Sequence, residues 1–180
     1  MKIDALNIPG SFVFTLPVHG DTRGSFENHF PKDLLNTPNE NFDIQQVNIS
    51  RNLLKGTLRG LHFQTSPYAE SKIVSCLVGE VFDVIVDLRP ESRNFGTWES
   101  VHLTPSFNSI LVPPGVAHGF QTLTDNSVLQ YLHSGKYSKS HSAGVRYDDP
   151  ALQISWPLET SIVSSEDLKL PTFIDMKDQL

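Results

Sequence analysis

Two histidines stand in short strings that also hold glycine, proline or arginine. His62 lies in GTLRGLHFQ, and His118 lies in VPPGVAHGF. A neutral imidazole has an intrinsic pKa of about 6.5, which suits it to proton transfer at neutral pH. The Pro-Pro-Gly turn before His118 fixes the backbone, and we expect it to direct that ring inward. A single histidine is more often structural, so these strings matter more than the residue type.

Two arginines could bind phosphate, because a planar guanidinium makes bidentate contacts with phosphate oxygens. Arg23 lies in DTRGSF, and Arg59 lies in RGLH. The formal net charge of −6 argues against a general nucleic-acid-binding surface. A negative protein can still bind a diphosphate where a few arginines meet in one cleft.

The segment 81–88, VFDVIVDL, predicts a strand with an unusual face. Period-two alternation places Phe82, Val84, Val86 and Leu88 on one side. The other side carries Val81, Asp83, Ile85 and Asp87. If that side lines a barrel interior, Asp83 sits in a partly buried polar pocket and needs a partner. Asp87 fits equally well as a charge at the barrel mouth.

The elements that must position these side chains are short strands. β-Branched and aromatic runs alternate with Gly, Pro, Asn and Asp, which predicts a sandwich or barrel. Only Pro31–Leu35 and Ser164–Leu170 look like short helices, the second with a serine N-cap. The predicted strands are Ile44–Ser50, Gly56–Gln64, Ile73–Val78, Val81–Leu88, Trp98–Leu103, Ser109–Val112 and Ser127–Leu132.

Length and composition predict one all-β domain over residues 1–180. The chain has 180 residues, of which 38% are hydrophobic and 19% charged. Cys76 is the only cysteine, which excludes an intrachain disulfide and fits a reducing compartment. We see no secretion signal in MKIDALNIPG and no run of about 20 apolar residues that could cross a membrane. We therefore expect a cytoplasmic protein with no membrane partner.

Two patterns resemble cupins, the double-sheet jelly-roll barrels that often hold a metal. Pro113, Gly115 and His118 follow the second cupin motif, and Gly56 and His62 follow the start of the first. The metal-binding version has a second histidine and a glutamate soon after the first, but this chain has Gln64 and a late Glu70 there. A transition metal usually needs three protein ligands. The resemblance implies the fold and argues against a metal.

Longer strings resemble the dTDP-4-dehydrorhamnose 3,5-epimerase family from about Gly20 to Pro171. This resemblance implies a cupin-like barrel that inverts C5 and C3 of a 4-keto-6-deoxy sugar nucleotide without a cofactor. The strings are RGLHFQ, SKIV, GEVFDVIVDLR, NFGTW, VPPGVAHGF, the pair Tyr131 and Tyr137, and DDPALQISWP.

The family's chemistry needs a base, a group that holds the enolate oxygen, and an acid on the opposite face of the sugar. By resemblance, His62 is the base and Asp167 the carboxylate that orients it. Lys72 matches the residue that steadies the enolate, and Tyr131 matches the acid. Each also has a plain structural interpretation: a helix-capping charge for Asp167, a solvated charge for Lys72, and packing for Tyr131.

The resemblance also implies the binding residues. Arg23 and Arg59 match the diphosphate-binding positions, with Phe26 as a stacking platform for the base. In the family the Arg23 segment reaches into the neighbouring subunit, which implies a homodimer with segment exchange. The remaining substrate-binding candidates are Asn28, Gln46, Asn48, Asp83, His118 and Tyr137.

The roles of Arg59 and His62 conflict with a regular strand. Strict alternation would place these two side chains on opposite faces, while the family role puts both in one cavity. Gly60 lies between them, and a glycine inside a strand often marks a bulge. We therefore predict an irregularity at Gly60.

The chain departs from the family at recognition positions. Asn28, beside Glu27, stands where a glutamate is usual, Ser142 replaces another glutamate, and Glu166 replaces a lysine. The nucleotide and sugar therefore stay open. The alternatives are an epimerase that inverts one centre, on a dTDP- or CDP-linked sugar, a non-catalytic sugar-nucleotide-binding cupin, and a metal-dependent cupin isomerase or dioxygenase.

Overall fold

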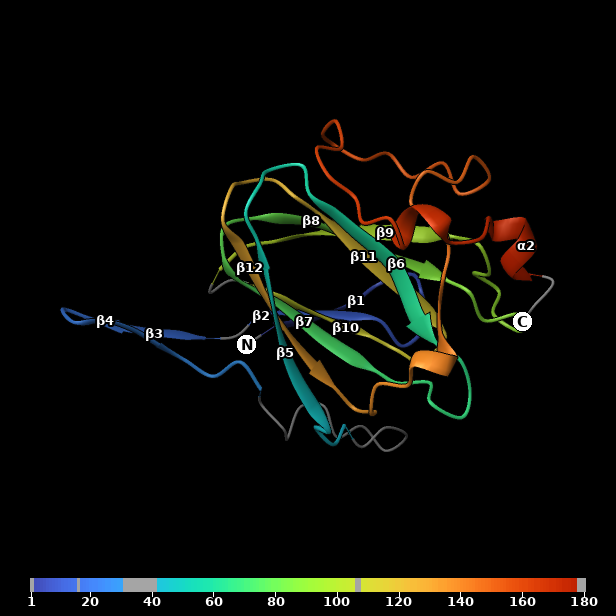
Figure 1. Ribbon diagram of the computed structural model, residues 1–180. Helices are drawn as coiled ribbons and strands as arrows, with labels where there is room; N and C mark the ends of the chain where they lie inside the picture. Colours follow the sequence, from blue (N-terminus) through green and yellow to red (C-terminus); the bar gives the residue numbers. More distant parts are fainter. Residues whose placement is uncertain (1, 16, 31–41, 106–107, 178–180) are drawn as a thin grey trace.

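The computed structural model describes residues 2–15, 17–30, 42–105 and 108–177. Two antiparallel sheets face one another, as Figure 1 shows. The larger sheet has six strands in the order β1-β2-β10-β7-β12-β5. Its strands are β1 (Lys2–Ala5), β2 (Phe12–Thr15), β10 (Ser109–Val112), β7 (Lys72–Val78), β12 (Ser127–His133) and β5 (Gln46–Asn52).

The second sheet has five strands in the order β13-β6-β11-β8-β9. The two sheets confirm the expected all-β, double-sheet arrangement. The strands of this second sheet are β13 (Ser142–Gly144), β6 (Leu58–Gln64), β11 (Val116–Thr122), β8 (Val81–Asp87) and β9 (Trp98–Leu103).

A separate two-stranded hairpin projects from the body. It consists of β3 (Val18–Asp21) and β4 (Gly24–Glu27), which pair only with each other. Figure 1 shows it extending well away from the two sheets. Seven of its eight residues are exposed, so this arm packs little against the described part of its own chain.

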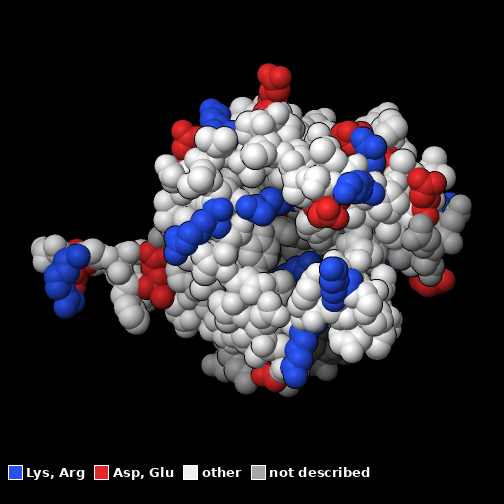
Figure 2. Space-filling view, viewed as in Figure 1, with Lys and Arg blue, Asp and Glu red and all other residues white. Residues whose placement is uncertain are grey.

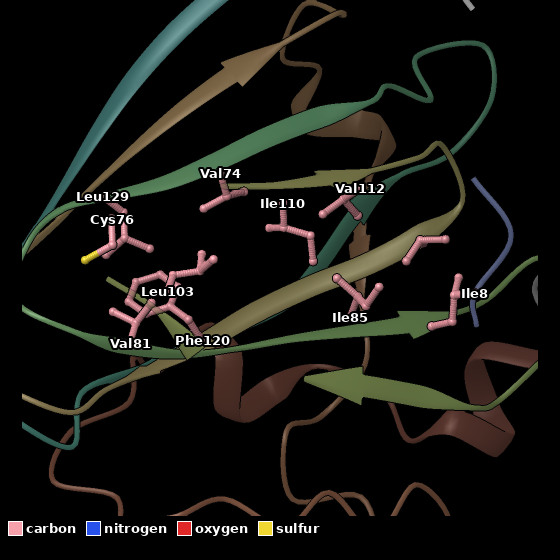
Figure 3. Close-up of a cluster of buried hydrophobic side chains, with 11 residues drawn as sticks. Ile8, Val74, Cys76, Val81, Ile85, Leu103, Ile110, Val112, Phe120 and Leu129 are labelled. Atoms are coloured by element: carbon pink, nitrogen blue, oxygen red, sulfur yellow. The ribbon is translucent and has the colours of Figure 1, made fainter. Parts of the chain in front are cut away.

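The main core lies between the two sheets. Figure 3 shows side chains from both sheets meeting there, including Val74 and Ile110 from the larger sheet and Ile85 and Phe120 from the smaller one. Strand β8 shows the predicted alternation. Its residues Val81 and Ile85 point into this core, while its other apolar side chains pack on the outer face of the sheet.

The outer faces of both sheets are covered by irregular segments. Val145, Leu152 and Met176 from the C-terminal part cover the smaller sheet. The larger sheet is covered by Phe42, with Phe30 packed beside it. This C-terminal part also joins β6 directly, because the backbones of Leu61 and Val145 exchange two hydrogen bonds.

Every predicted strand is present, with ends shifted by no more than a few residues. Strand β11 and the short strands β1, β2, β3, β4 and β13 were not among the predicted ones. In β11, Gly119 interrupts the apolar pattern. The predicted helix Ser164–Leu170 is shorter than expected: it is the single 3₁₀ turn η2 (Asp167–Lys169). The short helix α2 (Phe173–Lys177) follows. A further turn, η1 (Lys139–His141), precedes β13. The predicted helix Pro31–Leu35 lies outside the described residues.

Candidate active site

A cavity of about 340 Å³ opens between the two sheets. Its walls come from β5, β7 and β12 of the larger sheet, β6 and β11 of the smaller sheet, and the segment around η2. Figure 2 shows lysine and arginine side chains beside a hollow on this face. The predicted residues that line the cavity are Asn48, Arg59, His62, Lys72, His118, Tyr131 and Asp167.

His62 and Asp167 form a hydrogen-bonded pair, with 2.7 Å between His62 Nε2 and Asp167 Oδ1. The Gly60 amide donates to the other carboxylate oxygen, at 3.3 Å, and the Asp167 amide donates to Ser164 Oγ. Burial alone raises the pKa of Asp167, but the hydrogen bond and charge of His62, with the Gly60 amide and Ser164, lower it below its usual value. Asp167 is therefore ionised at neutral pH and can support a protonated imidazole.

An irregularity in β6 brings Arg59 and His62 into the same cavity. His62 pairs with His118 and Arg59 pairs with Phe120, so β6 uses one residue more than β11 over this stretch. Gly60 has a φ of +120°, and a Cβ there would lie 2.6 Å from Gly119 Cα. The bulge predicted at Gly60 is confirmed, and its position requires glycine.

Lys72 and Tyr131 come from the larger sheet and face the cavity from the other side. Lys72 Nζ donates to the His62 carbonyl oxygen at 3.3 Å. Burial lowers the pKa of Lys72, and the nearby Glu70 carboxylate partly offsets that effect. Burial, together with the charge of Asp83, holds the pKa of the Tyr131 phenol well above 10.0, so the phenol keeps its proton at neutral pH.

His118 and Asp83 form a second, deeper pair, with 2.7 Å between His118 Nε2 and Asp83 Oδ2. Asp83 is fully buried, more deeply than the strand pattern predicted, and His118 is the partner that it was expected to need. Burial raises the pKa of Asp83, and His118 offsets this only in part. The His118 ring meets Tyr131 edge-on, with 5.7 Å between centroids. The His118–Asp83 pair therefore packs against the Tyr131 ring through His118.

Polar side chains surround the cavity mouth. Arg59 Nε donates to Asn52 Oδ1 at 2.7 Å, which fixes the guanidinium at the edge. Gln46 Nε2 donates to Asn48 Oδ1 at 2.9 Å, and Gln46 Oε1 accepts from the Tyr137 amide at 3.4 Å. Gln46 therefore lies beside the lining residue Asn48, and the Tyr137 backbone lies beside Gln46.

Three predicted binding residues lie on or just after the projecting hairpin, away from the cavity of their own chain. Arg23 lies on the projecting hairpin, with Asp21 3.0 Å from its Nε, and Phe26 there is 80% exposed. Asn28 follows the hairpin and accepts a hydrogen bond from the Phe30 amide. One subunit alone does not bring these residues to His62.

Sequence reasoning missed His133 and gave Glu70 no role except as an absent metal ligand. His133 lines the cavity, and its Nδ1 lies 3.2 Å from Glu70 Oε1. The signal for His133 was available, because it follows Tyr131 by two residues and therefore shares its face of the strand. The link to Glu70 depends on the pairing of β7 with β12.

The described part of the chain holds neither a metal-binding cluster nor a membrane-spanning helix. Within residues 2–15, 17–30, 42–105 and 108–177, no group of three or more His, Cys, Asp or Glu side chains is arranged to hold a metal ion. Over the same residues, every helix is too short or too polar to span a bilayer.

Known proteins match this chain over nearly its whole length. The profile of the family described as dTDP-4-dehydrorhamnose 3,5-epimerase matches residues 5–175. The dTDP-4-dehydrorhamnose 3,5-epimerase of Shigella flexneri is 37% identical, covering 97% of each chain. A solved epimerase from Mycobacterium tuberculosis is 37% identical with a TM-score of 0.92, covering 99% of this chain and 92% of the other. A 3,5-epimerase from Legionella pneumophila, solved with dTDP-4-keto-L-rhamnose, is 34% identical with a TM-score of 0.88, covering 96% and 93%.

Proposed function

The chain belongs to the dTDP-4-dehydrorhamnose 3,5-epimerase family, and we propose that it converts dTDP-4-dehydro-6-deoxy-D-glucose to dTDP-4-dehydro-L-rhamnose. The reaction inverts C5 and C3 by removing one proton and returning another at each centre. Membership of the family and the arrangement of the cavity support this activity. A role in the synthesis of cell-surface polysaccharide such as O-antigen follows from the product.

The C4 ketone makes the neighbouring C–H bonds acidic. His62 takes the proton, and the electron pair of the broken C–H bond moves into an enolate whose negative charge lies on the C4 oxygen. The Lys72 ammonium stabilises that oxygen, while Asp167 stabilises the imidazolium. Tyr131 then donates its proton to carbon from the other face, and solvent restores both groups. Because the ketone of the substrate accepts the electron pair, this mechanism uses no metal or other cofactor.

One observation carries the proposal: a hydrogen-bonded His62–Asp167 pair and a protonated phenol, Tyr131, lie in the same cavity on strands of opposite sheets. Inversion needs a base and an acid on opposite faces of the sugar ring. A non-catalytic sugar-nucleotide-binding protein has no need for this arrangement.

The test is a panel of 4-keto-6-deoxy sugar nucleotides, linked to dTDP, UDP or CDP, incubated with the protein in deuterated water. We expect the dTDP sugar to gain two deuterons, one at C3 and one at C5. A single deuteron would identify an epimerase that inverts one centre, and exchange with none of the panel would reject the proposed activity. Activity that requires stoichiometric iron, manganese or zinc would favour the metal-dependent alternative.

We propose that the active form is a homodimer in which each hairpin reaches the cavity of the other subunit. Arg23 and Phe26 are exposed on an arm that leaves its own chain, whereas the cavity mouth presents Arg59 and Asn48. Arg23 would join Arg59 on the diphosphate, and Phe26 would stack on the base. The free, reduced Cys76 is consistent with a cytoplasmic location.

A further inference from the structure

A third imidazole–carboxylate contact lies in the cavity wall formed by the larger sheet. Glu70 lies two residues before the start of β7, and His133 ends β12, directly opposite Lys72 in the strand pairing. His133 Nδ1 lies 3.2 Å from Glu70 Oε1. The Glu70 side chain is only 6% exposed and that of His133 is 13% exposed, so water screens this contact weakly.

The same Glu70 oxygen also faces Lys72. Lys72 Nζ lies 4.0 Å from Glu70 Oε1, which is too long for a hydrogen bond but close for two buried charges. The loop after β12 packs against this carboxylate, since a Cβ on Gly135 would lie 2.9 Å from Glu70 Cβ. Glu70 is therefore held between the ammonium and the imidazole.

His133 has a second contact, with the phenol of Tyr131. The two rings are stacked, with 5.9 Å between centroids and 14° between planes. The His118 ring meets the same phenol edge-on. The other ring nitrogen of His133, Nε2, lies 3.4 Å from Asn48 Nδ2. The imidazole is thus fixed at both nitrogens and presents its face to Tyr131.

We propose that Glu70 and His133 form a positioning pair for the epimerisation, in which the carboxylate holds the Lys72 ammonium and the imidazole holds the Tyr131 ring. This inference rests on the proposed function. The pair connects the group that stabilises the enolate to the group that returns the proton, although the two act on different atoms. A purely structural pair would only tie β7 to β12.

The substitution Glu70→Gln tests whether the Glu70 carboxylate holds the Lys72 ammonium, because glutamine keeps the shape of the side chain and removes its negative charge. Lys72 must be protonated to stabilise the enolate, and the Glu70 carboxylate raises its pKa. Without that carboxylate, Lys72 loses its proton at lower pH. We expect kcat near neutrality to fall about tenfold, KM to change less than about threefold, and the alkaline limb of kcat to move to lower pH.

The other ionisable groups near Lys72 remain in this variant and are shared with the parent. They are Arg59 and His62 on β6, His118 on β11, Tyr131 and His133 on β12, Asp83 behind His118, and Asp167. The matched control is Glu80→Gln, which removes the carboxylate of the exposed pair His102–Glu80. This control should keep the parental kcat and pH profile. A lower melting temperature in Glu70→Gln with an unchanged alkaline limb would overturn the proposal.

Two substitutions of His133 test the effect on Tyr131. His133→Phe keeps an aromatic face beside the phenol, whereas His133→Gln keeps a hydrogen-bond donor and removes the ring. In deuterated water we expect the ratio of epimerised product to exchanged substrate to fall severalfold for the Gln variant and to stay near the parental value for the Phe variant. Equal ratios in both variants would contradict the proposed stacking role of His133. If Glu70→Gln does not fold, these two variants test the proposed positioning pair without it.

A measurement without turnover separates this inference from the proposed function. The Lys72 ammonium can be titrated by nitrogen-detected NMR in the parent and in Glu70→Gln. We expect a lower titration midpoint in the variant, and equal midpoints would overturn the coupling. A shifted midpoint in a protein that exchanges no sugar nucleotide would leave the contact in place and reject the epimerase function instead.

Discussion

The carboxylates of two similar histidine pairs in the cavity have pKa values that shift in opposite directions. The His62–Asp167 and His118–Asp83 contacts are both 2.7 Å long. Asp167 also has the Gly60 amide and Ser164 as neighbours, and its pKa is lowered. Asp83 is fully buried, its Oδ1 has no hydrogen-bond partner among the described residues, and its pKa is raised. The donors around Asp167 therefore favour its negative charge, whereas burial disfavours the negative charge of Asp83.

Replacing His62 with Asn should stop deuterium exchange at both C3 and C5. Loss of a general base lowers the rate by about 10²–10⁴-fold, while an amide of similar size leaves folding and nucleotide binding near normal. Proton NMR of the substrate in deuterated water measures the exchange. His102→Asn, which alters a surface histidine, is the control and should behave as the parent. Exchange at the parental rate in the His62 variant would contradict its role as the base.

Replacing Tyr131 with Phe should separate exchange from inversion. His62 and Lys72 do not depend on the phenol hydroxyl, so the enolate still forms. His62 can then return a proton only to the face from which it came. The variant should incorporate deuterium into unreacted substrate while epimerised product falls steeply, by about 10²-fold or more. If exchange and product fall together, another group, such as His118 or a bound water, is the acid.

At the scale of elements, two glycines allow β6 and β11 to approach closely enough to shape the site. A Cβ on Gly60 would lie 2.6 Å from Gly119 Cα, and a Cβ on Gly119 would lie 2.6 Å from the Arg59 carbonyl oxygen. The close approach coincides with the extra residue in β6. This local arrangement, rather than the regular strand, brings Arg59 and His62 to one cavity.

Gly60→Ala should therefore lower both stability and activity. The φ of +120° and the overlap with Gly119 should together reduce the free energy of unfolding by at least about 2 kcal/mol. Urea denaturation monitored by circular dichroism measures this change.

Gly24→Ala is the matched control for that substitution. Gly24 also has a positive φ, of +135°, but a Cβ there would meet no atom within 4 Å. It should cost clearly less stability than Gly60→Ala. Equal losses would mean that backbone strain alone, and not the contact with Gly119, requires glycine at position 60.

At the scale of the whole molecule, the two sheets form most of the cavity walls, and the β3–β4 hairpin extends away from the cavity. Burial in the body is extensive, whereas nearly all of β3 and β4 is exposed. An isolated two-stranded hairpin is only marginally stable in water. Its extended form is therefore best explained by a second copy of the chain that receives it, which the proposed dimer provides.

Mixing two inactive variants tests whether each cavity uses the hairpin of the other subunit. If Arg23 acts in trans, a mixed dimer of Arg23→Ala and His62→Asn chains has one intact cavity and one doubly altered cavity. Random reassociation should then restore up to about a quarter of the parental activity. Sedimentation should show a dimer for both variants. No recovery on mixing, with dimers present, would place Arg23 in the cavity of its own chain.

The sequence by itself determined seven of the strands and the alternation of β8, because β-branched runs and period-two burial are local signals. The bulge at Gly60 was predicted from a glycine between two side chains that the family resemblance places in one cavity. The family strings, rather than local patterns, identified His62, Lys72, His118 and Tyr131 as site residues. They also added Asp167, which lies far from His62 along the chain.

The tertiary structure alone decided the side-chain contacts that no local pattern specifies. Strand β11 was not predicted, because Gly119 interrupts its apolar pattern. Only the close packing of β11 against β6 explains why a glycine stands there. The contact of Glu70 with Lys72 and His133 depends on the register of β7 against β12, which no local pattern specifies. The opposite pKa shifts of Asp83 and Asp167 follow from burial and from the number of nearby donors. Both quantities arise from residues distant in sequence, so they exist only once the sheets have closed on each other.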